Sequence, residues 1–310
     1  MAAKYEMTHS ILTILGPTAS GKSELALALA RRRGAELLNV DSMQVYRGMD
    51  IGTAKASPAE RSEIRHHLLD VVEPNESYTV ARFVQDADQV IADCRERSVP
   101  LIAAGGTPLY YKSLFQGIFE GPGADESLRQ RLREQNPTDL YQQLSQVDPA
   151  AAGRIHPNDS KRLIRALEVY ELTGKPISSL QTHWQSEPKR HQTVWVGLTT
   201  DRDKLNRRIN QRVKQMVESG WVDEVQRLLE RYGTLSPTAA EAAGYTQIID
   251  HLHGKSSLEE AIEQIKIQTR QLARRQIKWF RRFEGVLWLD VDEPLDQKVN
   301  RVLSVWSDLP

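Results

Sequence analysis

The sequence contains a single cysteine, Cys94, among its 310 residues. One thiol cannot form an internal disulfide, and it excludes a cysteine-rich zinc module. No cluster of cysteine, histidine or acidic residues accompanies the pair His66–His67 along the chain, so we expect no zinc site there. Cys94 ends an amphipathic pattern, which indicates a packing role in a reducing, cytoplasmic protein.

Long apolar runs are also missing. No stretch approaches the roughly 20 apolar residues that cross a bilayer. The N-terminal residues do not combine an apolar core with a small-residue cleavage site, so neither a membrane protein nor a secreted one is expected. An excess of one charge is absent too, because 41 basic residues balance 41 acidic residues. Any contact with nucleic acid must therefore come from local basic clusters.

What the chain does contain is an alternation of strand and helix patterns. The apolar run at residues 10–15 precedes a helical pattern at 22–33, and comparable pairs follow. Such alternation predicts a parallel sheet with helices on its faces. We expect an α/β core of the P-loop NTPase type at residues 1–124 and 193–310, with basic helices in its C-terminal part. Residues 125–192 show helical patterns only, which predicts a smaller all-helical insertion domain.

Residues 16–23, GPTASGKS, have the G-x-x-x-x-G-K-[ST] pattern of a phosphate-binding loop. The pattern lies between a predicted strand and a predicted helix, which is the context that supports it. In such a loop, backbone N–H groups and the lysine bind phosphate oxygens, and the final hydroxyl ligates Mg²⁺. The residues predicted to bind the phosphate groups are Gly16, Pro17, Thr18, Ala19, Ser20, Gly21, Lys22 and Ser23, with Ser23 as the metal ligand.

The loop alone does not specify ATP, because it recognises a diphosphate whatever else the ligand carries. A nucleotide hydrolase normally has a second signature, an apolar strand that ends in Asp or Glu. The best candidate strand, at residues 99–106, ends in glycines, and Asp70 follows only a short apolar lead. The sequence therefore lacks the acid-ended strand that is expected of a nucleotide hydrolase.

Asp41 lies at the end of the strand predicted at residues 36–42, at the ligand edge of such a sheet. Three roles are open to it: indirect binding of magnesium, acceptance of a proton from a nucleophile, and capping of the next turn. Ser42 and Gln44 place further polar groups beside it. A glutamine amide is suited to paired hydrogen bonds with an adenine edge.

Two helical segments have basic faces. In residues 270–283, Arg270, Arg274 and Lys278 recur every four residues. Because arginine binds phosphate through two hydrogen bonds, we interpret this stripe as an RNA-binding surface and not as a solvated face. The opposing apolar side consists of Leu272, Trp279, Phe280 and Phe283. The second face consists of Lys204, Arg208 and Arg212, with Leu205, Ile209, Val213 and Met216 toward the core.

Five segments, in chain order, resemble the tRNA dimethylallyltransferases, also called tRNA isopentenyltransferases. They are GPTASGKS, NVDSMQVYRGMDIGTAK, AGGTPLYYKSL, NDSKRLIRALEVYELTGKPIS and RQLARRQIKWFR. The resemblance extends from about residue 10 to about residue 283. It implies transfer of a dimethylallyl group from dimethylallyl diphosphate to the exocyclic N6 amine of the adenosine 3′-adjacent to the anticodon. The absence of a zinc-binding extension resembles the bacterial type.

The resemblance also implies roles for residues. Asp41 is the expected general base, Lys22 neutralises the leaving diphosphate, and Thr107 lies near the reacting atoms, although an N-cap role suits Thr107 equally. One of Arg208 and Arg212 is expected to bind diphosphate. The expected tRNA contacts are Asp41, Ser42, Met43, Gln44, Thr107, Arg129, Lys161, Arg162, Leu163, Ile164, Arg165, Gly244, Tyr245, Arg274, Arg275, Gln276, Lys278 and Arg281. Thr246 stands where the family commonly has arginine, which puts one contact in question.

Mg²⁺ is the expected cofactor, and the expected partners are dimethylallyl diphosphate and the anticodon stem-loop of tRNA, which the insertion domain would clamp. We expect a cytoplasmic monomer that does not bind membranes. Two other functions stay open at this point. One is an isopentenyltransferase acting on free adenine nucleotides, which would need neither a large insertion nor an arginine-rich helix. The other is a nucleotide-dependent RNA-binding protein, which would need the acid-ended strand.

Overall fold

The computed structural model describes residues 10–117, 121–180 and 190–307; expectations for residues 1–9, 118–120, 181–189 and 308–310 lie outside it. The chain divides into two compact units, residues 1–114 with 191–310 and residues 115–190. The second unit therefore begins earlier than the predicted boundary at residue 125. Residues directly before its first helix also bond to it, since Arg165 donates to the carbonyl of Pro122 at 2.9 Å.

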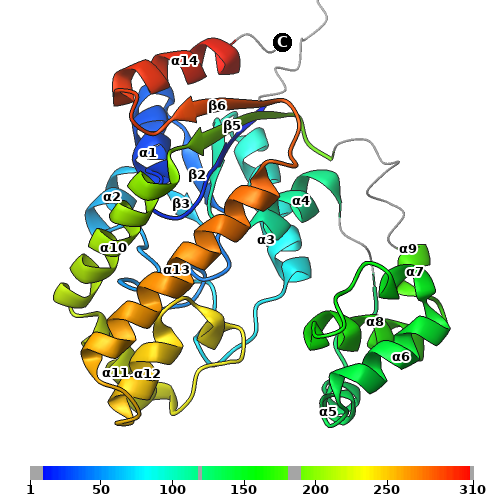
Figure 1. Cartoon of the computed structure of the whole chain (residues 1–310). Coiled ribbons are helices and arrows are strands. Elements are labelled where there is room, and N and C mark those ends of the chain that lie inside the picture. Colours follow the sequence, from blue (N-terminus) through cyan, green and yellow to red (C-terminus); the bar gives the residue numbers. More distant parts are fainter. Residues whose placement is uncertain (1–9, 118–120, 181–189, 308–310) are drawn as a thin grey trace, which may run out of the picture. The chain divides into compact units, whose positions relative to one another are not determined.

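A six-stranded, entirely parallel sheet lies at the centre of the first unit, in the order β3-β2-β4-β1-β5-β6 (Figure 1). This confirms the predicted α/β class. The strands are β1 (Ile11–Leu15), β2 (Glu36–Asn39), β3 (His66–His67), β4 (Leu101–Ala104), β5 (Thr193–Thr199) and β6 (Val286–Asp290). The edge strand β3 was not predicted, because two residues are too few to form an alternating pattern.

Helices connect the strands. The helices of this part of the chain are α1 (Lys22–Arg33), α2 (Pro58–Glu63), α3 (Val80–Glu96), α4 (Pro108–Gln116), α10 (Arg202–Glu218), α11 (Trp221–Tyr232), α12 (Tyr245–Leu252), α13 (Leu258–Phe280) and α14 (Leu295–Ser307). Helices α1, α4, α13 and α14 are among those that pack against the sheet. A 3-10 turn at Ala239–Glu241 precedes α12. None of the helices in the described ranges is long and apolar enough to cross a membrane.

Alternate residues of the strands supply the two faces of the core. On one face, Val196 of β5 packs in a cluster with Leu29 of α1 and Val302 of α14. On the other face, the ring of Trp195 lies 6.1 Å from that of Tyr111 on α4, centroid to centroid. The ring of Phe280 at the end of α13 lies 6.0 Å from Tyr111. Helix α13 is thereby fixed against the sheet next to the strand that leads into the phosphate loop.

The apolar side predicted for α13 is only partly correct. Phe280 and Phe283 are buried, but Leu272 and Trp279 are only half-buried. The buried stripe instead contains Ala261, Ile265, Ala273, Gln276 and Phe280. A polar residue, Gln276, therefore occupies a core position, and its hydrogen bonds explain why.

The described residues of the second unit form helices joined by loops and contain no strand, as predicted. Its helices are α5 (Glu126–Arg133), α6 (Pro137–Val147), α7 (Pro149–Ala152), α8 (Ser160–Thr173) and α9 (Ile177–Leu180). They enclose a separate core that contains Leu132, Leu144 and Leu167. The proposed role of this unit in holding tRNA stays a prediction.

Candidate active site

The phosphate-loop residues Gly16–Ser23 connect β1 to α1 in the middle of the sheet. Gly21 caps α1 with a φ of 87°, a left-handed conformation that is favourable for glycine. The N-terminus of the 12-residue helix α1 follows directly, so its unpaired N–H groups and its dipole attract an anion at this point. The local geometry therefore suits phosphate, as the sequence pattern predicted.

Three charged side chains meet beside this loop: Lys22, Arg212 of α10 and Asp41. The ammonium group of Lys22 donates to the carbonyl of Pro17 at 2.7 Å. Burial and, to a lesser degree, Arg212 together lower the pKa of Lys22 to about 7, although Asp41 acts in the opposite direction. Burial also lowers the pKa of Arg212, against the effect of Asp41. The two cations thus lie in an environment that lacks enough negative charge, which an incoming diphosphate would supply.

Asp41 lies two residues after β2, beside the phosphate loop. Its Oδ1 accepts a hydrogen bond from the N–H of Met43 at 2.9 Å, so the turn-capping role is real. The other oxygen, Oδ2, would lie 3.1 Å from a Cβ on Gly106, so the absence of a side chain at Gly106 keeps space beside it. One carboxylate oxygen therefore fixes the turn, and the second is directed toward the turn after β4.

Thr107 and Ser42 hold the loops after β4 and β2 together. The hydroxyl of Thr107 accepts from the N–H of Ser42 at 3.0 Å and donates to the Ser42 hydroxyl at 3.2 Å. The side chain of Thr107 thus bonds to the loop that carries Asp41. It acts as a brace of that loop, and its predicted contact with tRNA stays a prediction.

Gln44 is held in one orientation. Its amide nitrogen donates to the carbonyls of Thr53 and Ala54 at 3.0 and 3.3 Å. Because both neighbours are carbonyl oxygens, both amino hydrogens are used, and the amide offers a ligand its oxygen as an acceptor. Our interpretation of Gln44 as a paired donor and acceptor for adenine is therefore wrong for this conformation. A single hydrogen bond from an exocyclic amine fits.

Lys22, Asp41, Gln44 and Arg212 line a cavity of about 160 Å³. Its polar end contains Thr18, Lys22, Ser23 and Arg212, and Asp41 and Gln44 also line it. Its apolar wall consists of Ile209, Val213, Met216, Trp221 and Leu272. A second, more open cavity of about 520 Å³ shares Lys22, Ser23 and Arg212 with the first. The phosphate loop can therefore be approached from two sides, as two substrates that meet require.

Arg208 and Arg212, which the sequence could not separate, have different surroundings. The guanidinium of Arg208 donates to the carbonyl of Ala19 at 2.9 Å and lines only the more open of the two cavities. Arg212 lines both cavities and acts electrostatically on Lys22. The geometry favours Arg212 as the diphosphate-binding residue and Arg208 as a support of the loop backbone.

Gln276 of α13 joins two loops of the site. Its oxygen accepts from the N–H of Thr18 at 2.8 Å, and its nitrogen donates to the carbonyl of Gly106 at 2.6 Å. The side chain is buried, at 5% exposed, so in this conformation it does not face RNA. Its predicted tRNA contact is replaced by a bracing role, because the amide satisfies two otherwise unpaired backbone groups.

The exposed side of α13 is strongly basic. Arg274, Arg275, Lys278 and Arg281 are all exposed. A groove between α10 and α13 is lined by Arg202, Arg270, Arg274, Lys278 and Arg281. The arrangement suits a phosphate backbone, so the predicted RNA-binding surface is present as a surface, and its ligand stays a prediction.

In the second unit, several predicted tRNA-binding residues pack in the core or form ion pairs within the protein. Leu163 and Ile164 are buried in the core, so their side chains do not face a ligand. Arg129 donates twice to the buried carboxylate of Glu168, at 2.8 and 3.0 Å, and Arg165 donates to it at 2.6 Å. Lys161 and Arg162 are exposed. In this segment, the exposed side chains of Lys161 and Arg162 are therefore the ones available to contact RNA.

Gly244 and Tyr245 are also interior. A Cβ on Gly244 would lie 2.2 Å from the ring of Trp221, and Tyr245 is fully buried with its hydroxyl donating to Glu224 at 2.7 Å. The predicted tRNA contacts at these two positions are therefore not available to their side chains in this conformation. Thr246 is exposed and donates to the carbonyl of Ala240 at 2.9 Å.

Contrary to our expectation for the histidine pair, His67 does have acidic and thiol neighbours. Its Nε2 lies 2.7 Å from Glu36, and Glu36, His67 and Cys94 are close enough to suggest a metal site. However, Arg97 also binds Glu36 with two bonds of 2.7 Å and, with His67, lowers its pKa to about 2. Burial raises the pKa of Cys94 to about 11, so the thiol stays protonated. This cluster is an ion-pair network.

Part of the cavity wall was not predicted from the sequence. Gly52, Thr53 and Ala54 line the cavity, as do Trp221 and Met216. The first three lie in a segment that carried the family resemblance, but no single residue there suggested a ligand. The apolar spacing of residues 205–216 was interpreted as core, and nothing in that pattern distinguishes a core-facing side chain from a cavity-facing one.

Comparison with known proteins gives consistent results. The family model described as IPP transferase matches residues 44–283. A tRNA dimethylallyltransferase of Geobacter metallireducens is 43% identical over 307 residues, which are 98% of this chain and 99% of the relative. The solved tRNA isopentenylpyrophosphate transferase of Bacillus halodurans is 39% identical with a TM-score of 0.73, over 96% of each chain. A eukaryotic dimethylallyltransferase described as acting on tRNA is 31% identical with a TM-score of 0.82, over 96% of this chain and 79% of its own.

Proposed function

Because this chain belongs to the IPP transferase family, as its sequence resemblance predicted, we propose that it transfers a dimethylallyl group from dimethylallyl diphosphate to tRNA and releases diphosphate. The acceptor atom is the exocyclic N6 amine of the adenosine 3′-adjacent to the anticodon. The names of the relatives support tRNA as the acceptor. The observation that carries the proposal is a single cavity with a phosphate-binding end, an apolar wall and the carboxylate of Asp41.

The donor fits this cavity in one orientation. Its diphosphate belongs at the phosphate loop, next to Lys22 and Arg212, and its five-carbon group belongs against the apolar wall. The exposed hydroxyl of Ser23 lines both cavities beside Lys22, so it is suitably placed to ligate Mg²⁺ together with phosphate oxygens. When bound there, Mg²⁺ would supply further neutralisation of the diphosphate charge.

Transfer breaks the bond between C1 of the dimethylallyl group and the diphosphate oxygen, and it forms a bond from C1 to N6. The electron pair of the broken bond leaves with diphosphate, where Lys22 and Arg212 stabilise the added negative charge. The N6 amine is a weak nucleophile because its lone pair is delocalised into the ring. Asp41 accepts the proton that N6 loses, and the apolar wall limits attack by water.

The acceptor base must leave its stack to reach this cavity, and an unpaired loop base is extruded at lower cost than a paired one. Gln44 offers an acceptor oxygen to the exocyclic amine. The exposed cations of α13 would bind the RNA backbone. Binding of the anticodon arm by the second unit, a monomeric state and a cytoplasmic location remain predictions.

The test incubates the protein with Mg²⁺ and radiolabelled dimethylallyl diphosphate, with unmodified tRNA or with AMP and ATP as acceptor. Label in tRNA alone is the expected result. Label in the free nucleotide would instead establish a nucleotide isopentenyltransferase. No label, together with ATP hydrolysis, would support the nucleotide-dependent RNA-binding protein and refute transfer.

The Asp41→Asn variant tests the mechanism in the same assay. It should lower the transfer rate by about 10²-fold or more, because general-base catalysis contributes on that scale. The affinity for tRNA should stay nearly unchanged. Transfer by this variant at the wild-type rate would remove Asp41 from the reaction.

A further inference from the structure

The segment that follows Asp41 and Gln44 turns back to form part of the same cavity. Residues Tyr46–Lys55 have no regular secondary structure, yet Gly52, Thr53 and Ala54 line the cavity beside Gln44. We refer to residues 46–55 as the wall loop. An irregular backbone segment next to a reaction site needs specific partners to hold one conformation.

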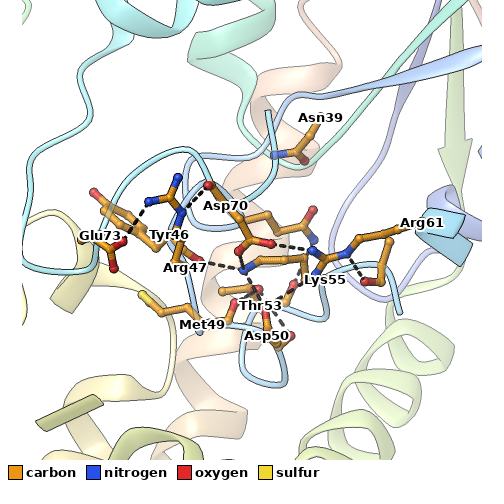
Figure 2. A network of polar contacts seen from close by, with 12 residues as sticks. Asn39, Tyr46, Arg47, Met49, Asp50, Thr53, Lys55, Arg61, Asp70 and Glu73 are labelled. Atoms are coloured by element: carbon orange, nitrogen blue, oxygen red, sulfur yellow. Dashed lines mark hydrogen bonds and ion pairs between the residues drawn. The ribbon is translucent and has the colours of Figure 1, made fainter. Parts of the chain in front are cut away.

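The first of these partners is Lys55, at the end of the wall loop (Figure 2). Its side chain is fully buried, and its ammonium group donates to the carbonyl of Tyr46 at 2.7 Å. It also donates to the carboxylates of Asp50 and Asp70, each at 2.6 Å. Lys55, at the end of the wall loop, is therefore bonded to its start at Tyr46 and to its middle at Asp50. Its bond to Asp70 connects the loop to a neighbouring segment.

The second partner is Glu224 on α11, far away in the sequence. Its carboxylate accepts from three successive backbone N–H groups, those of Asp50, Ile51 and Gly52, at 2.9, 2.6 and 3.2 Å. A fourth donor is the hydroxyl of Tyr245 at 2.7 Å. Glu224 is only 4% exposed. With four donors around it, this carboxylate is committed to holding the loop and is not available as a second base.

The close packing of Gly52 against Trp221 also holds the wall loop on α11. A Cβ on Gly52 would lie 2.1 Å from the Nε1 of Trp221, so only glycine allows the loop to approach α11 this closely. Trp221 itself is 1% exposed and packs edge-on against Tyr245, with ring centroids 5.7 Å apart. The wall loop therefore rests on a rigid surface made by α11 and α12.

The carbonyls of the loop then set Gln44. The residues directly after Gly52 are Thr53 and Ala54, and their carbonyls accept from the Gln44 amide. A continuous series of contacts thus leads from the Glu224 carboxylate, through the backbone at residues 50–54, to the amide oxygen that Gln44 presents to the cavity.

We propose that Glu224 is a positioning residue for the acceptor base: its buried carboxylate fixes the wall loop, and the wall loop holds Gln44 in the orientation that receives an exocyclic amine. The inference rests on the proposed function, because it assigns the Gln44 side of the cavity to the base. Glu224 does not touch the reacting atoms, and the diphosphate end is held by other residues.

The Glu224→Gln variant tests this with two independent measurements. Glutamine keeps the shape but has only one acceptor oxygen, so at least one of the three N–H groups loses its partner. Hydrogen exchange of the peptide covering residues 46–55 should accelerate about tenfold or more. In transfer assays, kcat/KM for tRNA should fall about tenfold or more, because small displacements of a reacting group are costly. KM for dimethylallyl diphosphate should stay within about twofold of the wild-type value.

Asp223→Asn is the matched control, because Asp223 is the exposed neighbour of Glu224 on the same helix. It should change neither measurement. If the Glu224 variant is too unstable to assay, Tyr245→Phe removes one donor to the same carboxylate, and it should shift both measurements in the same direction by about threefold.

The two measurements separate the possible failures. Unchanged exchange at residues 46–55 would mean that Glu224 does not hold the loop. Faster exchange with an unchanged kcat/KM for tRNA would mean that the loop does not position the base. Either result overturns the inference. Failure of the wild-type protein to label tRNA would instead refute the proposed function, and the exchange experiment would still report on the loop.

Discussion

The affinity of this protein for dimethylallyl diphosphate should decrease above neutral pH, because Lys22 loses its charge there. Burial and the neighbouring Arg212 lower the pKa of Lys22 to about 7 in the unliganded site. A diphosphate placed against the ammonium group supplies the missing negative charge, which raises that pKa toward its ordinary value of about 10.4. Above pH 7, binding must therefore take up a proton.

The magnitude follows from linkage between proton binding and ligand binding. Below pH 7 the lysine is charged with and without ligand, so affinity does not depend on its titration. Above pH 7, each further unit of pH reduces the charged fraction of Lys22 to nearly one tenth of its previous value. The dissociation constant should then rise about eightfold between pH 7.5 and 8.5. The ligand does not contribute, since its terminal phosphate, with a pKa of about 6, is already ionised over this range.

Isothermal titration calorimetry with dimethylallyl diphosphate, at constant excess Mg²⁺ and without tRNA, measures this directly. Repeating the titration in two buffers with different heats of ionisation gives the number of protons taken up. Arg212→Met should move the onset of the decrease to higher pH, because one cause of the lowered pKa is removed. Arg208→Met should not move it, because Arg208 is not among the causes of the lowered pKa of Lys22. A constant affinity from pH 7.5 to 8.5, without proton uptake, would refute the reasoning.

Three further predictions concern other parts of the molecule. Replacing Arg274 and Lys278 together by glutamine should reduce the slope of log affinity for tRNA against log salt concentration by about 1.4 to 1.8, whereas an unchanged slope would identify a solvated face. Gln276→Glu places a carboxylate against the carbonyl of Gly106 and should weaken donor binding about tenfold, while Gln271→Glu, on the exposed side of α13, should have no effect; equal affinities in calorimetry would contradict the bracing role. Glu168→Gln should lower the free energy of unfolding by about 1–3 kcal/mol in denaturant titrations, because Arg129 and Arg165 lose their shared charged partner. As the control, Glu171→Gln at the exposed ion pair with Arg131 should lower it by less than about 1 kcal/mol.

Local patterns in the sequence were sufficient for the class of fold and for the phosphate loop. Glycine spacing, a lysine and a following helix are contiguous, and their chemistry depends on short-range geometry that neighbouring residues impose. The alternation of apolar strands with amphipathic helices likewise predicted the parallel sheet, because each element must bury one face or stripe. The edge strand β3 escaped this reasoning, since its two residues carry no period.

The sequence did not predict the partners of individual side chains. Gln276 and Tyr245 look like surface candidates in a basic or polar segment, but the packing of α13 and α12 turns both inward. Likewise, Glu36, His67 and Cys94 come from three separate elements and meet only in the folded sheet. Sequence spacing within one helix cannot predict which face a distant element will cover.

The sequence by itself was sufficient to predict a phosphate-binding loop after β1 and to identify the family to which the chain belongs. Only the tertiary structure decided how the rest of the cavity is held. Glu224 reaches residues 50–52 from more than 170 positions away, with sequence separations of 174, 173 and 172 for the three bonded pairs. A carboxylate that satisfies three backbone N–H groups leaves no trace in local composition, because its partners are main-chain atoms that every sequence possesses.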